Sequence, residues 1–286
     1  MVDIGRDAEW DFAGTAVAAP FRGAMIGYRD AGGAGVDLRV AGTAAITVLI
    51  EFGGRGLVVE DASGRRTLDG FVAGLPLAAM RVRGERAECV EVRLSPVRAY
   101  ALLGIAPTDL GPDAVGLEDL WGARARRLRA RLAEAGTWEE RFALTKTFLA
   151  HGDRPTRAPD PEVLASWERI LGSGGQVRIG ALAESVGWSH KRLLTRFESQ
   201  IGLTPKRAAM LVRFRSAVDG LLAGRPAAEV AADCGYTDQA HLSRDVSIFA
   251  HRPPGALTAH YLPTIAQHRY RAWGKFFQYR GVPAGR

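Results

Sequence analysis

Hydrophobic and polar residues alternate in short runs between about residues 45 and 94, and glycines separate the runs. The run from Glu88 to Leu94 alternates polar and apolar residues with a period of two, which predicts a strand with one solvent-exposed face. Glycines between such runs are typical of turns. Strands are expected at residues 46–52, 57–60, 71–73, 79–82 and 88–94. Together they indicate a β-sandwich or a small barrel.

After Pro96 the apolar residues take on helical spacing. Helices are expected at residues 97–103, 123–135 and 138–150. Several arginines lie between positions 124 and 131, and we interpret most of them as the solvent-exposed side of a helix whose Leu128 and Leu132 point inward. A nucleic-acid patch is the alternative interpretation. Residues 151–160 carry prolines, a glycine and charged residues without apolar periodicity, which is typical of a linker.

From Pro161 onward the pattern is helical, and two similar segments follow each other at residues 181–193 and 229–242. In each segment a helix of small residues ends at a glycine, Gly187 or Gly235, and an aromatic residue and a capping residue come next. Glycine suits the left-handed conformation that lets a helix stop and turn. The caps of the second helices are Ser189 in the first segment, and either Thr237 or Asp238 in the second. This order predicts two helix-turn-helix units.

A long helix is predicted between the two units, because Thr204-Pro205 is a cap followed by a first-turn proline. From Pro205 to Ala223 it spans about 28 Å at 1.5 Å per residue. This length is close to the roughly 34 Å between successive major-groove faces of B-DNA. The outward side chains of the second helices are of types that contact base edges and phosphates. We therefore expect the two units to read one face of DNA.

The 286 residues are 47% hydrophobic and 24% charged, which fits two ordinary globular domains. Residues 1–160 have a net charge of −1 (21 basic, 22 acidic) and residues 161–286 a net charge of +8 (17 basic, 9 acidic). A basic C-terminal part is the electrostatic footprint of a domain that meets a polyanion. Two cysteines, no secretion signal and no long apolar stretch predict a cytoplasmic protein that does not enter a membrane.

Residues 175–256 resemble the DNA-binding domain of the AraC/XylS family of bacterial transcription regulators. The stretch from Ala231 to Pro254 resembles the family signature in order and spacing, including the proline that closes it. The resemblance implies that seven positions tend to face bases: Lys191, Leu194, Thr195, Gln239, Ala240, Ser243 and Arg244. Two basic residues of the first unit join them as candidate DNA contacts, Arg192 and Arg196.

The resemblance has departures. Thr195 stands where an arginine is common, Val246 replaces a phenylalanine and His251 a glycine. Asp245 is expected to repel nearby phosphates and to weaken the second unit. Asp245 and Thr195 also support a different reading, in which the chain is an interaction protein that acts on a partner regulator and binds little DNA itself.

For the first domain the resemblance implies a cupin-like β-barrel with following helices, used for effector binding, dimerisation or both. A charged side chain there, at Glu51, Arg81 or Arg83, either points into the barrel to hold a polar effector or alternates outward to solvent. The first histidine is His151 and Cys89 stands apart from other cysteines, so no His-based or Cys-cluster metal site is expected in this domain. No phosphate loop, dinucleotide fingerprint or nucleophile elbow is found, so neither a catalytic residue nor a cofactor is expected.

The sequence therefore predicts an α+β, non-enzymatic, DNA-binding transcription regulator. Its expected parts are a β-rich sensory or dimerisation domain (1–150), a linker (151–160), a tandem helix-turn-helix domain (161–257) and a basic aromatic tail (258–286). The expected partners are double-stranded promoter DNA, a second copy of the chain, a small-molecule effector and RNA polymerase. The tail is expected either to add DNA backbone contacts or to pack on the second unit or a partner subunit.

Overall fold

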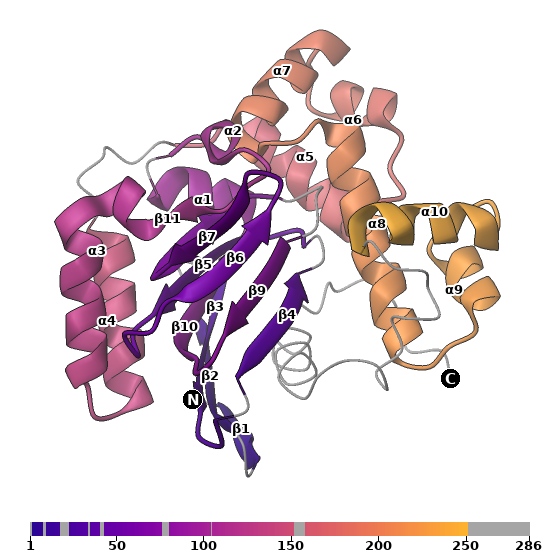
Figure 1. The fold of residues 1–286 in the computed structure, drawn as a ribbon. Helices are drawn as coiled ribbons and strands as arrows, with labels where there is room; N and C mark the ends of the chain where they lie inside the picture. The colour runs from indigo at the N-terminus through magenta and orange to yellow at the C-terminus, as the bar shows by residue number, and fades with distance from the viewer. Residues whose placement is uncertain are drawn as a thin grey trace.

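The computed structural model describes residues 2–7, 10–17, 23–33, 35–40, 43–75, 80–103, 105–151 and 158–250. Strands dominate the first part of the chain and helices the second, so the α+β prediction is confirmed (Figure 1). Strands were predicted in five places between residues 46 and 94, and all five are present with ends shifted by two residues at most. None of the helices in the described residues combines the length and the apolar character that a membrane crossing needs.

The strands pair in two sheets, of seven strands in the order β1-β2-β3-β10-β5-β8-β11 and of four in the order β4-β9-β6-β7. The larger sheet contains β1 (Val2–Asp7), β2 (Trp10–Val17), β3 (Gly23–Asp30), β5 (Ile46–Glu51), β8 (Gly70–Ala73), β10 (Glu88–Leu94) and β11 (Val115–Gly116). The smaller contains β4 (Val36–Val40), β6 (Leu57–Asp61), β7 (Gly64–Leu68) and β9 (Met80–Gly84). Neighbouring strands in both sheets of the described residues pair antiparallel.

The two sheets face each other across an apolar layer to which both contribute, as in a sandwich. The prediction that one face of β10 is exposed to solvent is wrong. Because β10 lies between β3 and β5, its alternate residues Cys89, Glu91 and Arg93 point into this layer and are 0%, 0% and 8% exposed. The two charges are compatible with burial because the Arg93 guanidinium donates to the Glu91 carboxylate at 3.1 Å.

Four helices follow the strands: α1 (Pro96–Leu102), α2 (Pro107–Leu110), α3 (Leu117–Glu134) and α4 (Trp138–Ala150). The antiparallel pair α3 and α4 covers the outer face of the larger sheet, and Leu128 and Leu132 are buried there, as predicted (Figure 1). One arginine of α3 departs from the predicted solvent-exposed side. Arg129 donates to the Glu51 carbonyl at 2.7 Å and to the Asp69 carboxylate at 2.6 Å, and so ties α3 to the sheet.

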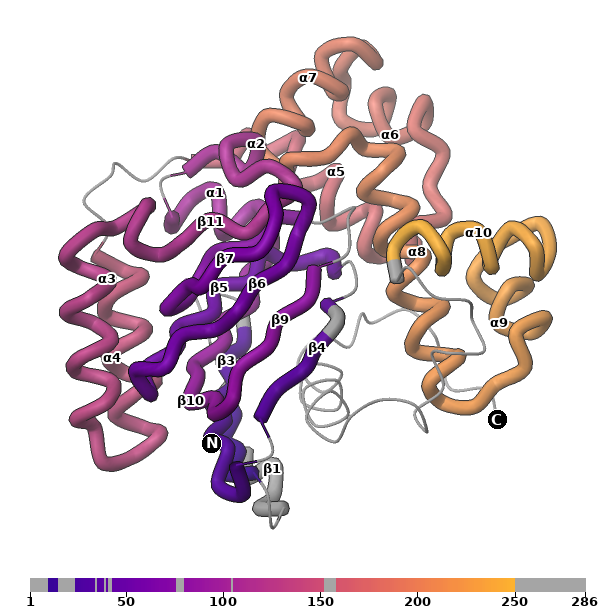
Figure 2. The backbone as a smooth tube through the Cα atoms, in the orientation of Figure 1, coloured from indigo at the N-terminus to yellow at the C-terminus, as the bar shows by residue number. Residues whose placement is uncertain are grey.

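The C-terminal helices are α5 (Pro161–Gly172), α6 (Ile179–Ser185), α7 (His190–Ile201), α8 (Pro205–Leu222), α9 (Ala227–Asp233) and α10 (Gln239–Ala250). The predicted linking helix is α8. It packs against α5 and α7 near one end and against α9 and α10 near the other, so the two short helix pairs lie at its two ends (Figure 2). The predicted linker falls partly outside the described residues, and the tail 258–286 lies wholly outside them.

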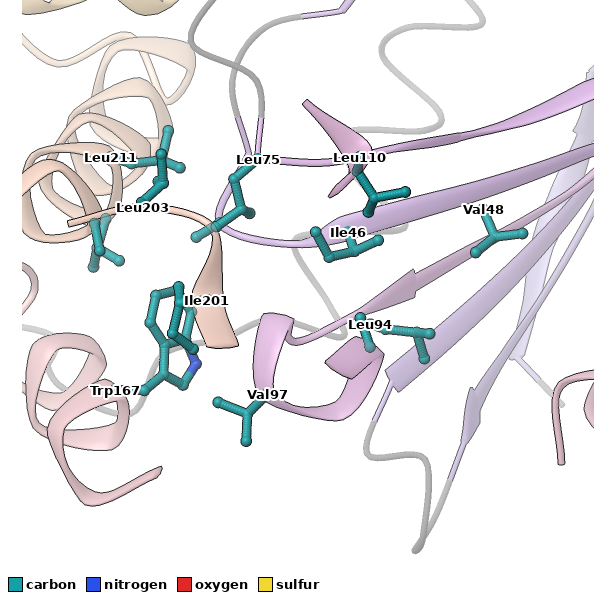
Figure 3. Close-up of a cluster of buried hydrophobic side chains, with 14 of the residues drawn as sticks. Ile46, Val48, Leu75, Leu94, Val97, Leu110, Trp167, Ile201, Leu203 and Leu211 are labelled. Carbon is teal, nitrogen blue, oxygen red and sulfur yellow. The ribbon is translucent and has the colours of Figure 1, made fainter. Parts of the chain in front are cut away.

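The N-terminal and C-terminal parts share one apolar cluster (Figure 3). Val97 and Leu110 of the helices after the sheets lie in the same buried cluster as Trp167 of α5 and Ile201 of α7. At the end of α7 the chain passes so close to α2 that a Cβ added to Gly202 would lie 2.9 Å from the Pro107 Cβ. The first helix-turn-helix unit is therefore packed directly on the N-terminal domain.

The crossing of the α5–α6 loop over α8 depends on one glycine. Gly175 has a φ of +80°, and an added Cβ would lie 2.2 Å from the Ala209 carbonyl oxygen of α8. We expect Gly175→Ala to lower the free energy of unfolding by about 2–5 kcal/mol, the sum of a left-handed alanine and an overpacked contact. Thermal denaturation of the full chain measures this effect.

Gly174 is the matched control, because its φ is +60° but an added Cβ meets nothing nearer than the Ser216 Oγ at 4.0 Å. Gly174→Ala should therefore show only the backbone cost of about 1–2 kcal/mol. Equal effects of the two substitutions would contradict the close crossing.

Candidate nucleic-acid interface

The two predicted helix-turn-helix units have the same turn, bond for bond. Gly187 and Gly235 both have a φ of +70°, the left-handed conformation predicted for them. The glycine N–H donates to Glu184 in the first unit and to Ala232 in the second, both at 3.1 Å. The N–H of the following aromatic residue likewise donates back to a helix carbonyl in each unit, at 3.1 and 2.9 Å. The repeat seen in the sequence is therefore a repeat of structure.

Short polar side chains begin both second helices. The Ser189 hydroxyl accepts from the Arg192 N–H at 3.3 Å, as predicted. In the second unit the cap is Asp238 and not Thr237, because the Asp238 carboxylate accepts from the His241 N–H at 2.6 Å. A carboxylate at a helix N-terminus is also favoured by the helix dipole.

One side of α7 is buried and the opposite side is open. Leu193 and Phe197 are fully buried against the rest of the unit. At about 100° per residue, Lys191, Arg192 and Thr195 centre on the opposite side, and all three are exposed. Leu194 lies on the flank and is half-buried. The Arg192 guanidinium is stacked 4.6 Å from the ring centre of Trp188, which limits its conformations before any ligand binds.

Arg196 is exposed, as expected of a DNA contact, but it lies on the flank of α7 that faces α5. Its guanidinium donates two hydrogen bonds to the Asp160 carboxylate, at 2.7 and 2.8 Å. These bonds hold the pKa of Asp160 below its ordinary value. The neighbouring Gln200 accepts from the Asp160 N–H at 2.9 Å. Of the basic residues predicted to contact DNA, Arg196 is the one that holds an intramolecular carboxylate.

The open side of α10 carries the candidates of the second unit. Leu242, Val246 and Phe249 are buried as its inner face. Gln239, Ala240 and Arg244 are exposed. The remaining candidate is half-buried Ser243, whose hydroxyl donates to the Gln239 carbonyl at 2.8 Å. The structure thus brings Lys191, Arg192 and Thr195 to the open side of α7 and the candidates of the second unit to that of α10, while Leu194 and Arg196 lie on the flanks of α7. His251 lies outside the described residues.

The expectation that Asp245 repels phosphates is wrong. Asp245 is 3% exposed and points inward, where it accepts from the Arg213 guanidinium of α8 at 3.2 Å. The same guanidinium lies 4.4 Å from the ring centre of Tyr236, and burial raises the pKa of the Tyr236 hydroxyl. Asp245 is therefore an internal anchor of α10, and it no longer supports a unit that avoids DNA. The departure at Thr195 remains.

The two units are also joined outside α8. The Gln176 side chain, in the loop before α6, donates to the Asp233 carbonyl at the end of α9, at 3.2 Å. A Cβ added to Gly235 would lie 2.5 Å from the Gln176 Oε1, so this loop touches the turn of the second unit. The turn of one unit therefore depends on a residue that precedes the other.

Of the charged candidates of the first domain, Arg81 and Arg83 alternate outward, one of the two expected positions, and Glu51 takes neither. Glu51 is buried, but its carboxylate accepts from the Gly53 N–H at 2.7 Å and faces Arg129, while burial raises its pKa. Arg81 and Arg83 bind Asp37 and Glu60 on the smaller sheet. In the described residues no group of three or more histidine, cysteine or acidic side chains is placed to hold a metal ion.

Three site features were not predicted. They are the ion pair between Asp160 and Arg196, the stacking of Arg192 on Trp188 and the hydrogen bond from Arg213 to Asp245. Arg192 follows Trp188 by four residues, a spacing that brings side chains together across the cap and that a sequence search could have found. The other two join residues more than thirty positions apart, and no local pattern signals them.

The C-terminal part of the chain matches a known domain family. Residues 182–260 match a family model described as a helix-turn-helix domain, which is of the AraC type. No curated protein matches the chain. Among solved structures, ToxT from Vibrio cholerae O395 aligns with 96% of this chain and 100% of its own at 9% identity, with a TM-score of 0.46. The C-terminal domain of AraT, a response regulator from Geobacillus stearothermophilus, aligns with 38% and 92% at 19% identity, with a TM-score of 0.35.

The substitution Asp245→Ala tests whether Asp245 holds α10 in place or acts as a surface charge that repels phosphates. Asp245→Ala leaves the Arg213 guanidinium, 17% exposed, without its carboxylate. We expect the free energy of unfolding to fall by about 3 kcal/mol, as for a broken buried ion pair. Thermal denaturation and DNA binding by fluorescence anisotropy measure the two consequences, and both should show a loss. A stable variant with tighter DNA binding would restore the phosphate-repelling role.

Proposed function

We propose that this chain is a DNA-binding transcription regulator of the AraC type that reads two adjacent major-groove segments with α7 and α10. The observation that carries the proposal is the repeated unit at the two ends of α8, each with most of its candidate residues on one open side. The 18 residues of α8 span about 27 Å. That length is comparable to the roughly 34 Å repeat of the groove.

The proposed contacts divide by chemistry. Lys191, Arg192 and Arg244 supply the positive charge that phosphates and guanine edges attract. Gln239 and Ser243 supply hydrogen bonds that discriminate bases, and Thr195 and Ala240 offer small surfaces to thymine methyl groups. The excess of basic residues after position 160 supports the same assignment, because phosphate contacts dominate affinity for DNA. Leu194 and Arg196, on the flanks of α7, complete the proposed set.

Control through the N-terminal domain is the second part of the proposal. The apolar layer between the sheets leaves a cavity of only about 20 Å³, lined by Tyr28, Leu49, Phe71 and Met80 among others. This volume is near that of a single water site, so a small-molecule effector there has to separate the sheets. Because α1 and α2 pack on α7, such a movement reaches the first unit. The proposal also includes domain boundaries at residues 150, 160 and 257. It further includes RNA polymerase as a partner and a cytoplasmic location.

A homodimer through α3 and α4 is the third part. The groove between these helices consists of two adjoining cavities of about 250 and 410 Å³. Arg124 and Arg127 line the first, Glu134 and Glu140 line the second, and Arg131 lines both. In a dimer with a two-fold axis, the basic end of this groove in one copy would lie against the acidic end of the groove in the other, since a two-fold interface is self-complementary.

DNA binding is tested by fluorescence anisotropy on the full-length protein, with DNA from upstream of its own gene and a scrambled control at two salt concentrations. Lys191→Ala and Arg244→Ala should each weaken specific binding by about 1–3 kcal/mol, the value of a base contact. Lys146→Ala, in α4 of the first domain, is the control and should leave affinity unchanged. Equal, weak binding of the wild-type protein to both DNAs would favour the alternative function, in which the chain acts on a partner regulator.

The dimer is tested by sedimentation velocity over a range of protein concentrations. Arg127→Glu combined with Arg131→Glu should convert the dimer to a monomer, because like charges then face each other across the groove. Arg126→Glu is the control, since Arg126 pairs with Glu118 and does not line the groove. A double variant that sediments as the wild type does would exclude this surface.

A further inference from the structure

The flank of α7 carries an ion pair that none of the preceding assignments requires. Asp160 is the residue at which the chain from the N-terminal domain enters the helices, directly before α5. Its carboxylate receives both hydrogen bonds of the Arg196 fork, at 2.7 and 2.8 Å. A planar, bidentate fork of this kind is also the geometry in which arginine binds a phosphate or a guanine edge. The carboxylate therefore occupies the same donors that DNA would use.

The Asp160 carboxylate is directed mainly at Arg196, with Gln200 and Arg192 as further neighbours. It makes no capping hydrogen bond to α5, although it stands at the N-cap position of that helix. The backbone N–H of Asp160 is held separately, by the buried Gln200 side chain at 2.9 Å. The residue is thus positioned through its backbone, and its side chain is directed at Arg196.

The pair is weak enough to exchange. The Arg196 side chain is 50% exposed and that of Asp160 is 23% exposed. Exposed pairs contribute little to stability, because water and salt compete with them. Contacts of arginine to phosphate in a protein–DNA interface release counterions from the DNA and are favoured by that release. DNA can therefore take Arg196 from Asp160 at a small cost.

We propose that Asp160 is an internal competitor of DNA for Arg196 and sets the affinity of the first helix-turn-helix unit. Asp160 acts through Arg196 and is a positioning residue: it holds the guanidinium against α5 until DNA replaces the carboxylate. Because Asp160 follows the linker, a shift of the N-terminal domain that moves the linker also changes how tightly Arg196 is held. The inference rests on the proposed DNA-binding function and deepens it.

The test compares Asp160→Asn with the wild type, in full-length protein, on the upstream DNA and its scrambled control by anisotropy at several salt concentrations. Asparagine keeps the backbone N–H and the shape of the side chain but loses the charge. We expect affinity to rise about two- to five-fold, the equivalent of an exposed ion pair. The slope of log K against log salt should steepen by up to about 0.9, since the wild type has to free a carboxylate to the surrounding cations when Arg196 binds a phosphate and Asp160→Asn does not. A purely structural role of Asp160 would not steepen that slope.

Two further variants separate this effect from general electrostatics. Glu198→Gln removes a negative charge from α7 that binds no arginine in the described residues, and should change neither affinity nor slope to the same extent. In an Arg196→Ala background, Asp160→Asn should raise affinity no more than Glu198→Gln does, since no bound arginine is left to release. A weaker or unchanged Asp160→Asn variant, or an equal gain without Arg196, overturns the inference while the wild type still binds the upstream DNA specifically. Loss of specific binding by the wild type itself overturns the proposed function instead.

Discussion

The relative position of the two candidate reading helices depends on the packing of α8. Its apolar residues are buried on more than one side, against α5 and α7 near its start and against α9 and α10 near its end. Gly175 lets the loop after α5 cross it at backbone distance, and Arg213 anchors α10 to it through Asp245. A helix held along its length is a stiff spacer, so the spacing of the two units is set within the protein before DNA is present.

The charged residues of the two helix-turn-helix units differ in how deeply they are buried. Asp245 and Arg213 neutralise each other inside the second unit, and Asp160 meets Arg196 at the edge of the first. The basic residues on the open sides of α7 and α10 are left toward solvent. A net charge counted along the sequence cannot distinguish these situations, since a buried pair contributes nothing to the field at the surface.

The sequence predicted well what short-range physics determines. The turn glycines, the caps Ser189 and Thr204, and the inward residues Leu193 and Leu242 depend on neighbours within four positions, and all are as predicted. It predicted poorly what depends on distant packing. Strands such as β2 and β3 lack a clear alternation, because the smaller sheet covers one face and Trp138 of α4 lies against the other. The inward direction of Asp245 depends on Arg213, which lies 32 positions earlier.

The central claim is that two units with a fixed spacing read one face of the double helix, and methylation protection of guanines tests it most directly. The DNA would be selected from a random library by the full-length protein and then probed in the complex. The account predicts two groups of protected major-groove positions on the same face, about 10–10.5 base pairs apart from centre to centre. A single protected group, or two groups on opposite faces of the helix, would contradict it.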